Sequence, residues 1–151
     1  MKAKKTYLKG KSVLIILVFT AINTLQAQDL LEHRWKDRLV LILSNDLADP
    51  ELRKQQEVFK GVKQELSDRK IIVYTVTPQF VYTSLKEMKK NRNNAVYTKY
   101  KKGTASFEVV LLGLDGGVKL RKNRVVKSEE LFGLIDQMPM RRAEMRNGGI
   151  P

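Results

Sequence analysis

Leu39-Val40-Leu41-Ile42-Leu43 is the stretch that decides the fold of this chain. A run that is apolar at every position is typical of a strand that is buried on both faces of a sheet. Ser44-Asn45-Asp46 then interrupts the pattern, and Asp49-Pro50-Glu51 has the features of a helix start: an N-cap residue, a proline for the first helical position and an acid in the first turn. The apolar spacing that follows predicts a helix over residues 50–67.

The chain beyond this helix continues to alternate strands with helices. Residues 71–76 are mostly β-branched and largely apolar, and residues 107–112 are apolar apart from Glu108; we expect both to be strands. Asp115-Gly116-Gly117 predicts a hairpin turn, because glycine accepts the positive φ of tight turns. Residues 118–121 alternate apolar and basic side chains, as an edge strand does, and residues 128–137 have the pattern of an amphipathic helix.

Residues 79–103 are rich in lysine and give a weaker pattern, for which we expect helical pieces over 83–91 and 93–100. The predicted order of elements is therefore β-α-β-(α)-β-β-α. A helical crossover makes the first two strands parallel, and the hairpin makes the last two antiparallel. This is the order of a thioredoxin-like α/β domain, with a four-stranded mixed sheet sandwiched by helices.

The N-terminal segment has the three parts of a secretory signal peptide: lysines at the start, an apolar run over residues 13–22, and the small residue Ala27 at the exit. We expect residues 1–27 to be this signal, residues 28–146 to be one domain, and residues 147–151 to be a flexible tail. An uncleaved N-terminal anchor is the alternative. The apolar run is short for a membrane span, which needs about 20 residues, so no integral span is expected after signal removal.

Composition narrows the functions open to the chain. The 151 residues carry a formal net charge of +13, and removal of residues 1–27, with five lysines and no acid, leaves 124 residues with a charge of +8. The chain has no cysteine, so thiol redox chemistry, disulfide exchange and cysteine metal sites are excluded. We expect no metal and no other cofactor.

Three motifs resemble catalytic or metal sites, and each has a simpler interpretation. Ser44 and Asp46 suggest a nucleophile with a base, but these residue types also bond their own backbone in a strand-to-helix turn, which we favour. His33 has no second histidine near it and is interpreted as a surface residue. The sequence around Asp115 lacks the alternating acidic residues of a calcium-binding loop, so we interpret Asp115 as a turn residue.

Two basic clusters are the candidate ligand-binding residues. The first is the segment 86–102, where lysines alternate with tyrosines that could stack on a ligand; its members are Lys99, Lys101, Lys102, Tyr97 and Tyr100. The second is Arg141 and Arg142, which follow Pro139. The alternatives are a solvated charged face for the first cluster, and arginine–carboxylate pairing inside the domain for the second.

Four segments of the sequence together resemble the domain of unknown function family 4174: Trp35-Lys36-Asp37-Arg38, the string Phe107–Arg121, and the stretches Leu131-Phe132 and Ile135–Met145. The resemblance covers residues 29–146. Similar domains occur in small exported bacterial proteins and in extracellular sushi-repeat-containing proteins, and are considered thioredoxin- or peroxiredoxin-like. The resemblance therefore implies a fold and an extracytoplasmic location, and it carries no catalytic residues. The role of the Met138–Met145 motif stays open.

Thioredoxin enzymes have their nucleophilic cysteine between the first central strand and the next helix, which corresponds to residues 44–50 of this chain. They also have a proline before the hairpin, which corresponds to residues 103–106. Neither feature is present. We therefore expect an exported non-catalytic binding or interaction module of the bacterial envelope, periplasmic or extracellular. Its partner would be an envelope protein or an anionic glycan, and no nucleic acid is expected. A thiol-independent enzyme on a peroxiredoxin-like scaffold and a polyanion binder are the alternatives.

Overall fold

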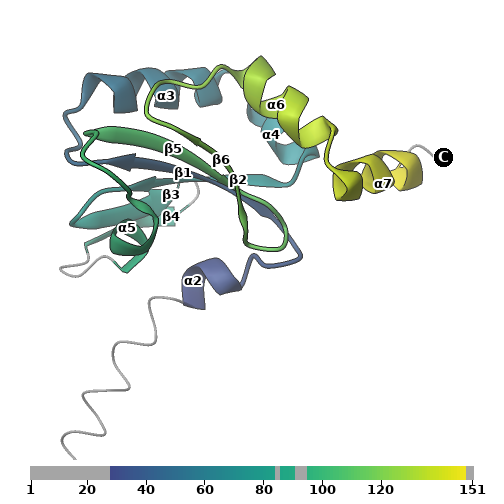
Figure 1. Cartoon of the computed structure of the whole chain (residues 1–151), viewed down its shortest axis with the longest axis horizontal. Helices are drawn as coiled ribbons and strands as arrows, with labels where there is room; N and C mark the ends of the chain where they lie inside the picture. The colour runs from purple at the N-terminus through teal and green to yellow at the C-terminus, as the bar shows by residue number, and fades with distance from the viewer. Residues whose placement is uncertain (1–27, 84–85, 91–94, 149–151) are drawn as a thin grey trace, which may run out of the picture.

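The computed structural model describes residues 28–83, 86–90 and 95–148. In this part of the chain one six-stranded mixed sheet lies between helices on both of its faces (Figure 1). The strands are β1 (Arg38–Ser44), β2 (Ile71–Val76), β3 (Phe80–Thr83), β4 (Lys86–Lys90), β5 (Phe107–Leu112) and β6 (Val118–Lys122). Their order across the sheet is β4-β3-β2-β1-β5-β6; β1 and β2 are parallel and every other pair is antiparallel.

Strand β1 lies in the middle of the sheet and all seven of its residues are buried. Leu39 is in register with Ile72 of β2 on one side and with Leu112 of β5 on the other. The apolar run from which the fold was predicted is therefore the central strand, and the mixed α/β class is confirmed.

The sheet has six strands rather than the predicted four. The extra strands, β3 and β4, pair antiparallel with each other at the β2 edge of the sheet. The helical piece predicted over residues 83–91 is wrong, because β4 occupies 86–90. The second predicted piece matches helix α5 (Ala95–Tyr100).

Two helices, α3 (Pro50–Lys60) and α4 (Lys63–Asp68), form the crossover between β1 and β2, where one helix over 50–67 was predicted. Asp49 is the N-cap of α3, as predicted, and its Oδ1 accepts a hydrogen bond of 2.8 Å from the backbone N–H of Glu51. That bond satisfies one of the donors that a helix start leaves unpaired.

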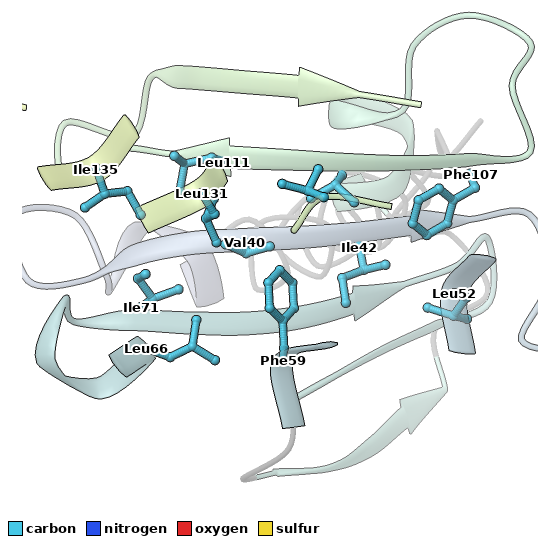
Figure 2. Packing of buried hydrophobic residues seen from close by; sticks show 12 residues of the cluster. Val40, Ile42, Leu52, Phe59, Leu66, Ile71, Phe107, Leu111, Leu131 and Ile135 are labelled. Atoms are coloured by element: carbon cyan, nitrogen blue, oxygen red, sulfur yellow. The ribbon is translucent and has the colours of Figure 1, made fainter. Parts of the chain in front are cut away.

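Side chains alternate between two apolar layers, one on each face of the sheet. Val40 and Ile42 of β1 pack under α3, α4 and α6 (Ser128–Asp136), and Figure 2 shows this layer, in which Phe59 and Leu131 contribute from the helices. Leu39, Leu41 and Leu43 belong to the layer on the other face, where α5 and α2 (Gln28–Leu31) lie. Burial of each leucine contributes about 1.5–3 kcal/mol, so a strand buried on both sides anchors both layers.

The last helix, α7 (Pro139–Gly148), extends away from the sheet and has no buried residue (Figure 1). It reaches two residues beyond the predicted domain end at residue 146, into the predicted tail 147–151. Met140 and Met145 are among its exposed side chains.

The predicted signal peptide, residues 1–27, lies outside the described residues, as do residues 149–151. Within the described part, no helix combines the length and the apolar character needed to cross a membrane.

Candidate functional site

A cavity of about 330 Å³ opens on the face of the sheet that carries α2 and α5. Its walls come from α2 and the loop after it, from α5, and from the turn 113–117 between β5 and β6. Leu39 and Leu112, which line it, are paired at one end of β1. Ser44 pairs with Phe107 at the other end, so the cavity lies far along β1 from the loop over residues 44–50.

The loop after α2 is fastened to the hairpin by a backbone hydrogen bond. The N–H of Trp35 donates to the carbonyl oxygen of Leu114 over 2.7 Å. Trp35 has φ 65° and Gly116 in the opposite turn has φ 79°, so both walls contain a residue in the left-handed region. That region is uncommon for residues other than glycine, so this geometry at Trp35 depends on the surrounding contacts.

His33 is held at both ring nitrogens on the cavity wall. Nδ1 lies 2.8 Å from Oδ2 of Asp37, and Nε2 lies 2.8 Å from the hydroxyl oxygen of Tyr74 in β2. Its side chain is 16% exposed, so the histidine that was interpreted as a surface residue is partly buried and has two side-chain partners. These bonds fix the loop against the sheet. Among the described residues, no group of three or more His, Asp or Glu side chains is placed to hold a metal ion.

The cavity has two cations without a carboxylate partner among the described residues. The Arg34 guanidinium carbon lies 5.9 Å from the centre of the Trp35 ring, and the Lys99 Nζ lies 5.2 Å from that of Tyr100. Both side chains are exposed and line the cavity. The carboxylate of Asp37, in contrast, is already bonded to His33.

Asp115, the other acid at the cavity, is bonded within its own turn. Its Oδ2 accepts a hydrogen bond of 2.7 Å from Lys119 Nζ, and its Oδ1 accepts one of 3.0 Å from the N–H of Gly117. The bond from Lys119 and then that from Gly117 hold the pKa of Asp115 below its usual value. The predicted hairpin turn is confirmed, and the charge of Asp115 is offset by that of Lys119.

Of the residues predicted to bind a ligand, Lys99 and Tyr100 line the cavity. Tyr97, on the same helix, donates a hydrogen bond of 2.6 Å from its hydroxyl to Oδ1 of Asn45, beside the other end of β1. Burial, and then the charge of Glu108, raise the pKa of the Tyr97 hydroxyl.

Lys101 is bonded inside the domain and does not belong to an open basic surface. Its Nζ donates to Oε1 of Glu108 over 3.1 Å and also to the carbonyl of Ala105. Glu108 is buried in β5, where it also accepts hydrogen bonds from Arg121 and from the backbone N–H of Lys102. The side chain of Lys102 is exposed, as is that of Lys99.

Arg141 lies in an ion-pair network near the start of β1. Its Nη1 donates to the carbonyl of Asp68 over 2.7 Å, and its Nε lies 3.4 Å from Oδ1 of Asp136. The internal arginine–carboxylate pairing considered for this cluster is thus present at Arg141. Arg142 is exposed, and none of the ion pairs of the described residues includes it.

The loop after β1 is a hydrogen-bonded turn, as interpreted from the sequence. The buried Ser44 hydroxyl donates to the carbonyl of Asp46 over 2.8 Å and lies 3.2 Å from Oδ2 of Asp49. Oδ1 of Asp46 accepts a bond of 3.1 Å from the N–H of Ala48. The side chains of Ser44 and Asp46 are therefore used to form the turn.

Sequence reasoning did not identify His33, Arg34 and Asp37 as cavity residues. Two segments could have indicated the cavity: Trp35-Lys36-Asp37-Arg38 and the string Phe107–Arg121, which contains the hairpin turn. Both resemble the family, but the sequence does not show that they are in contact. The structure joins the two segments through the hydrogen bond from Trp35 to Leu114.

Comparison with known proteins gives one match. The family model named "Domain of unknown function (DUF4174)" matches residues 29–144, which are most of the chain and nearly all of its described part. No curated protein and no solved structure matches the chain. The chain is a member of the DUF4174 domain family.

Proposed function

We propose that this chain is an exported, non-catalytic, thioredoxin-like module of the bacterial envelope that binds a small ligand in the cavity between α2, α5 and the β5–β6 turn. The observation that carries the proposal is the composition of the cavity. Apolar side chains of Leu39, Val96 and Leu112 line it beside two cations that have no carboxylate partner in the described part of the chain. Ligand sites combine apolar walls with a few polar groups in this way, and about 330 Å³ lies at the lower end of their usual range.

The strand arrangement supports the thioredoxin-like part of the proposal. Strands β2-β1-β5-β6 have the order and directions expected of such a domain, with a parallel pair and then an antiparallel hairpin. Helices α3, α4 and α6 pack on one face and α5 packs on the other. Relative to a four-stranded thioredoxin-like sheet, β3 and β4 are two additional strands at the β2 edge.

The lack of cysteine and the use of Ser44 in a turn support a binding role over a thioredoxin-type reaction. The basic and apolar parts of residues 1–27 support export. Since the cavity lies at the opposite end of β1 from the loop over 44–50, a ligand would not occupy the position at which thiol enzymes act.

A direct test uses the protein expressed from its full sequence with a C-terminal affinity tag and purified in the form that the cell produces. Indole, a small neutral apolar probe, is titrated while the methyl signals of Val96 and Leu112 are followed by NMR. We expect saturable shifts at both residues. Ala95→Trp, which fills the cavity, should abolish them, and the control Ala48→Trp, at an exposed position in the loop after β1, should not.

Absence of saturable shifts, or equal shifts in Ala95→Trp, would remove the cavity as a binding site. The non-catalytic part is tested separately with the same preparation. We expect no reduction of insulin disulfides and no consumption of hydrogen peroxide without added enzymes. Either activity, if it survives further purification, would overturn that part.

A second candidate function is thiol-independent hydrolysis, favoured by the position of His33 between Asp37 and Tyr74 on the cavity wall. An acid that orients a histidine is a common element of general-base catalysis. Hydrolysis of p-nitrophenyl acetate that is lost in His33→Gln, while the fold is kept, would favour this function. Equal rates for both proteins would exclude it for this ester.

A further inference from the structure

We infer that the ligand of the cavity is a small amphipathic carboxylate, with its anionic group between Arg34 and Lys99 and an unbranched alkyl part against Leu39, Val96 and Leu112. This inference rests on the proposed function and adds the chemical class of the ligand.

The charge balance of the cavity carries the first step. Several cations of the described residues are paired with carboxylates, as Arg69 is with Asp136 at 2.7 Å and, beside the cavity, Lys119 is with Asp115 at 2.7 Å. Arg34 lines the cavity and has no carboxylate partner among the described residues.

Lys99 is the second cation of this kind. The two carboxylates at the cavity are already bonded, that of Asp37 to His33 and that of Asp115 to Lys119 and Gly117. Counting Lys119, which is bonded to Asp115, three cations and two carboxylates lie at the cavity, so an anionic group between Arg34 and Lys99 would meet a net positive charge.

The hydrogen-bonding capacity of the hairpin wall carries the second step. The N–H of Gly113 donates to the Gly117 carbonyl and the N–H of Gly116 donates to the Gly113 carbonyl. The N–H of Gly117 donates to Asp115. These backbone donors are thus satisfied by the turn itself. A peptide placed there would bury amide groups without hydrogen bonds from this wall, which costs free energy, whereas an alkyl chain needs no such partner.

The size of the cavity sets the third step. Since one water takes up about 30 Å³ in the liquid, the space corresponds to roughly ten waters, or to about ten non-hydrogen atoms. Octanoate has this size and combines one carboxylate with an alkyl chain. A long polyanion is larger than this cavity, and Lys101, which was considered for it, is bonded to Glu108.

The experiment compares four probes on the purified protein by NMR titration of the Val96 and Leu112 methyl signals. Octanoate carries the predicted chemistry, octanol is its neutral counterpart and octylamine is its cationic counterpart. N-acetylleucine tests a carboxylate of peptide type. We expect octanoate to bind at least about fivefold more tightly than each of the others, and its affinity to fall as salt rises.

Variants test where the carboxylate lies. Arg34→Gln and Lys99→Gln should each weaken octanoate binding by roughly threefold to tenfold and leave octanol binding unchanged. Lys36→Gln and Lys102→Gln are matched controls, because both lysines are exposed and do not line the cavity. Neither control should change octanoate binding.

Each outcome separates the inference from the proposed function. If octanol binds as tightly as octanoate and neither cavity variant matters, the carboxylate is excluded while the cavity remains a binding site. If N-acetylleucine binds as tightly as octanoate, the alkyl part of the inference is wrong. If no probe, including indole, causes saturable shifts, both the inference and the proposed function fail.

Discussion

Arg38, the first residue of β1, and Glu144, in the last helix, form a two-pronged ion pair across 106 positions of sequence. Nη1 and Nη2 of the guanidinium each lie 3.1 Å from a different carboxylate oxygen. Nη1 also donates to the carbonyl of Arg69, while the buried Nε has no partner among the described residues. This pair connects α7, which has no buried residue of its own, to the sheet.

Glu144→Ala should lower the free energy of unfolding by about 2 kcal/mol, because it leaves the Arg38 guanidinium, 1% exposed, without its carboxylate. This loss of stability is smaller than that expected for a fully buried ion pair, because the Glu144 side chain is 20% exposed. Glu32→Ala, at an exposed position after α2, is the control and should change stability by less than about 0.5 kcal/mol. Urea denaturation of the purified proteins measures both, and equal losses would show that the ion pair contributes nothing specific.

The same carboxylate predicts a dependence of stability on pH. Burial raises the pKa of Glu144, but the hydrogen bond and charge of Arg38 outweigh it, so the pKa lies below its usual value. The pKa of Asp136 is lowered in the same way by Arg69 and Arg141, against the effect of burial. A lowered folded-state pKa contributes stability above the unfolded-state value, and that contribution is lost as the pH falls through the folded-state value.

We therefore expect the stability difference between the wild type and Glu144→Gln to be full above about pH 5 and to shrink progressively below about pH 4. Urea denaturation at a series of pH values measures it. A difference that stays constant down to pH 3 would contradict the ionic origin of the effect.

The contacts of Glu108 predict opposite behaviour for two adjacent lysines. Lys101→Met should cost about 1–3 kcal/mol of stability, because it removes one partner of a buried carboxylate. Lys102→Met should cost less than about 0.5 kcal/mol, since its side chain is exposed and its backbone N–H still reaches Glu108. Thermal or urea unfolding distinguishes the two, and equal costs would be evidence against this contact pattern.

The basic segment should bind polyanions only weakly, because Lys101 is bonded inside the domain. We expect the purified protein to leave a heparin column near or below the physiological ionic strength of about 0.15 M. The double change Lys99→Gln and Lys102→Gln should shift elution only slightly. Retention to high salt that is lost in the double variant would instead favour the polyanion-binding alternative.

The predicted signal cleavage determines the mass expected for the mature protein. Cleavage after Ala27 should yield a chain that begins at Gln28, because a small residue precedes the site at the end of an apolar run. Intact-mass measurement of the protein recovered from a bacterial envelope fraction tests this. A product that still begins at Met1 would favour the uncleaved anchor.

The central strand, the cap at Asp49 and the hairpin at Asp115 could be predicted from the sequence because each is a local property. A short run that is apolar on both faces is typical of a strand in the middle of a sheet, and a turn or cap depends on residues a few positions apart. The strands β3 and β4 were missed because their segment has a weak local pattern, and pairing with β2 decided their structure.

The composition of the chain alone determined that no thiol chemistry is possible, and local patterns determined the central strands and the family resemblance. Only the tertiary structure decided which charges are free. It paired Lys101 with Glu108 and Arg38 with Glu144, and it left Arg34 and Lys99 at one cavity. The physical reason is that an ion pair depends on distance in space, and the partners here come from segments that folding alone brings together.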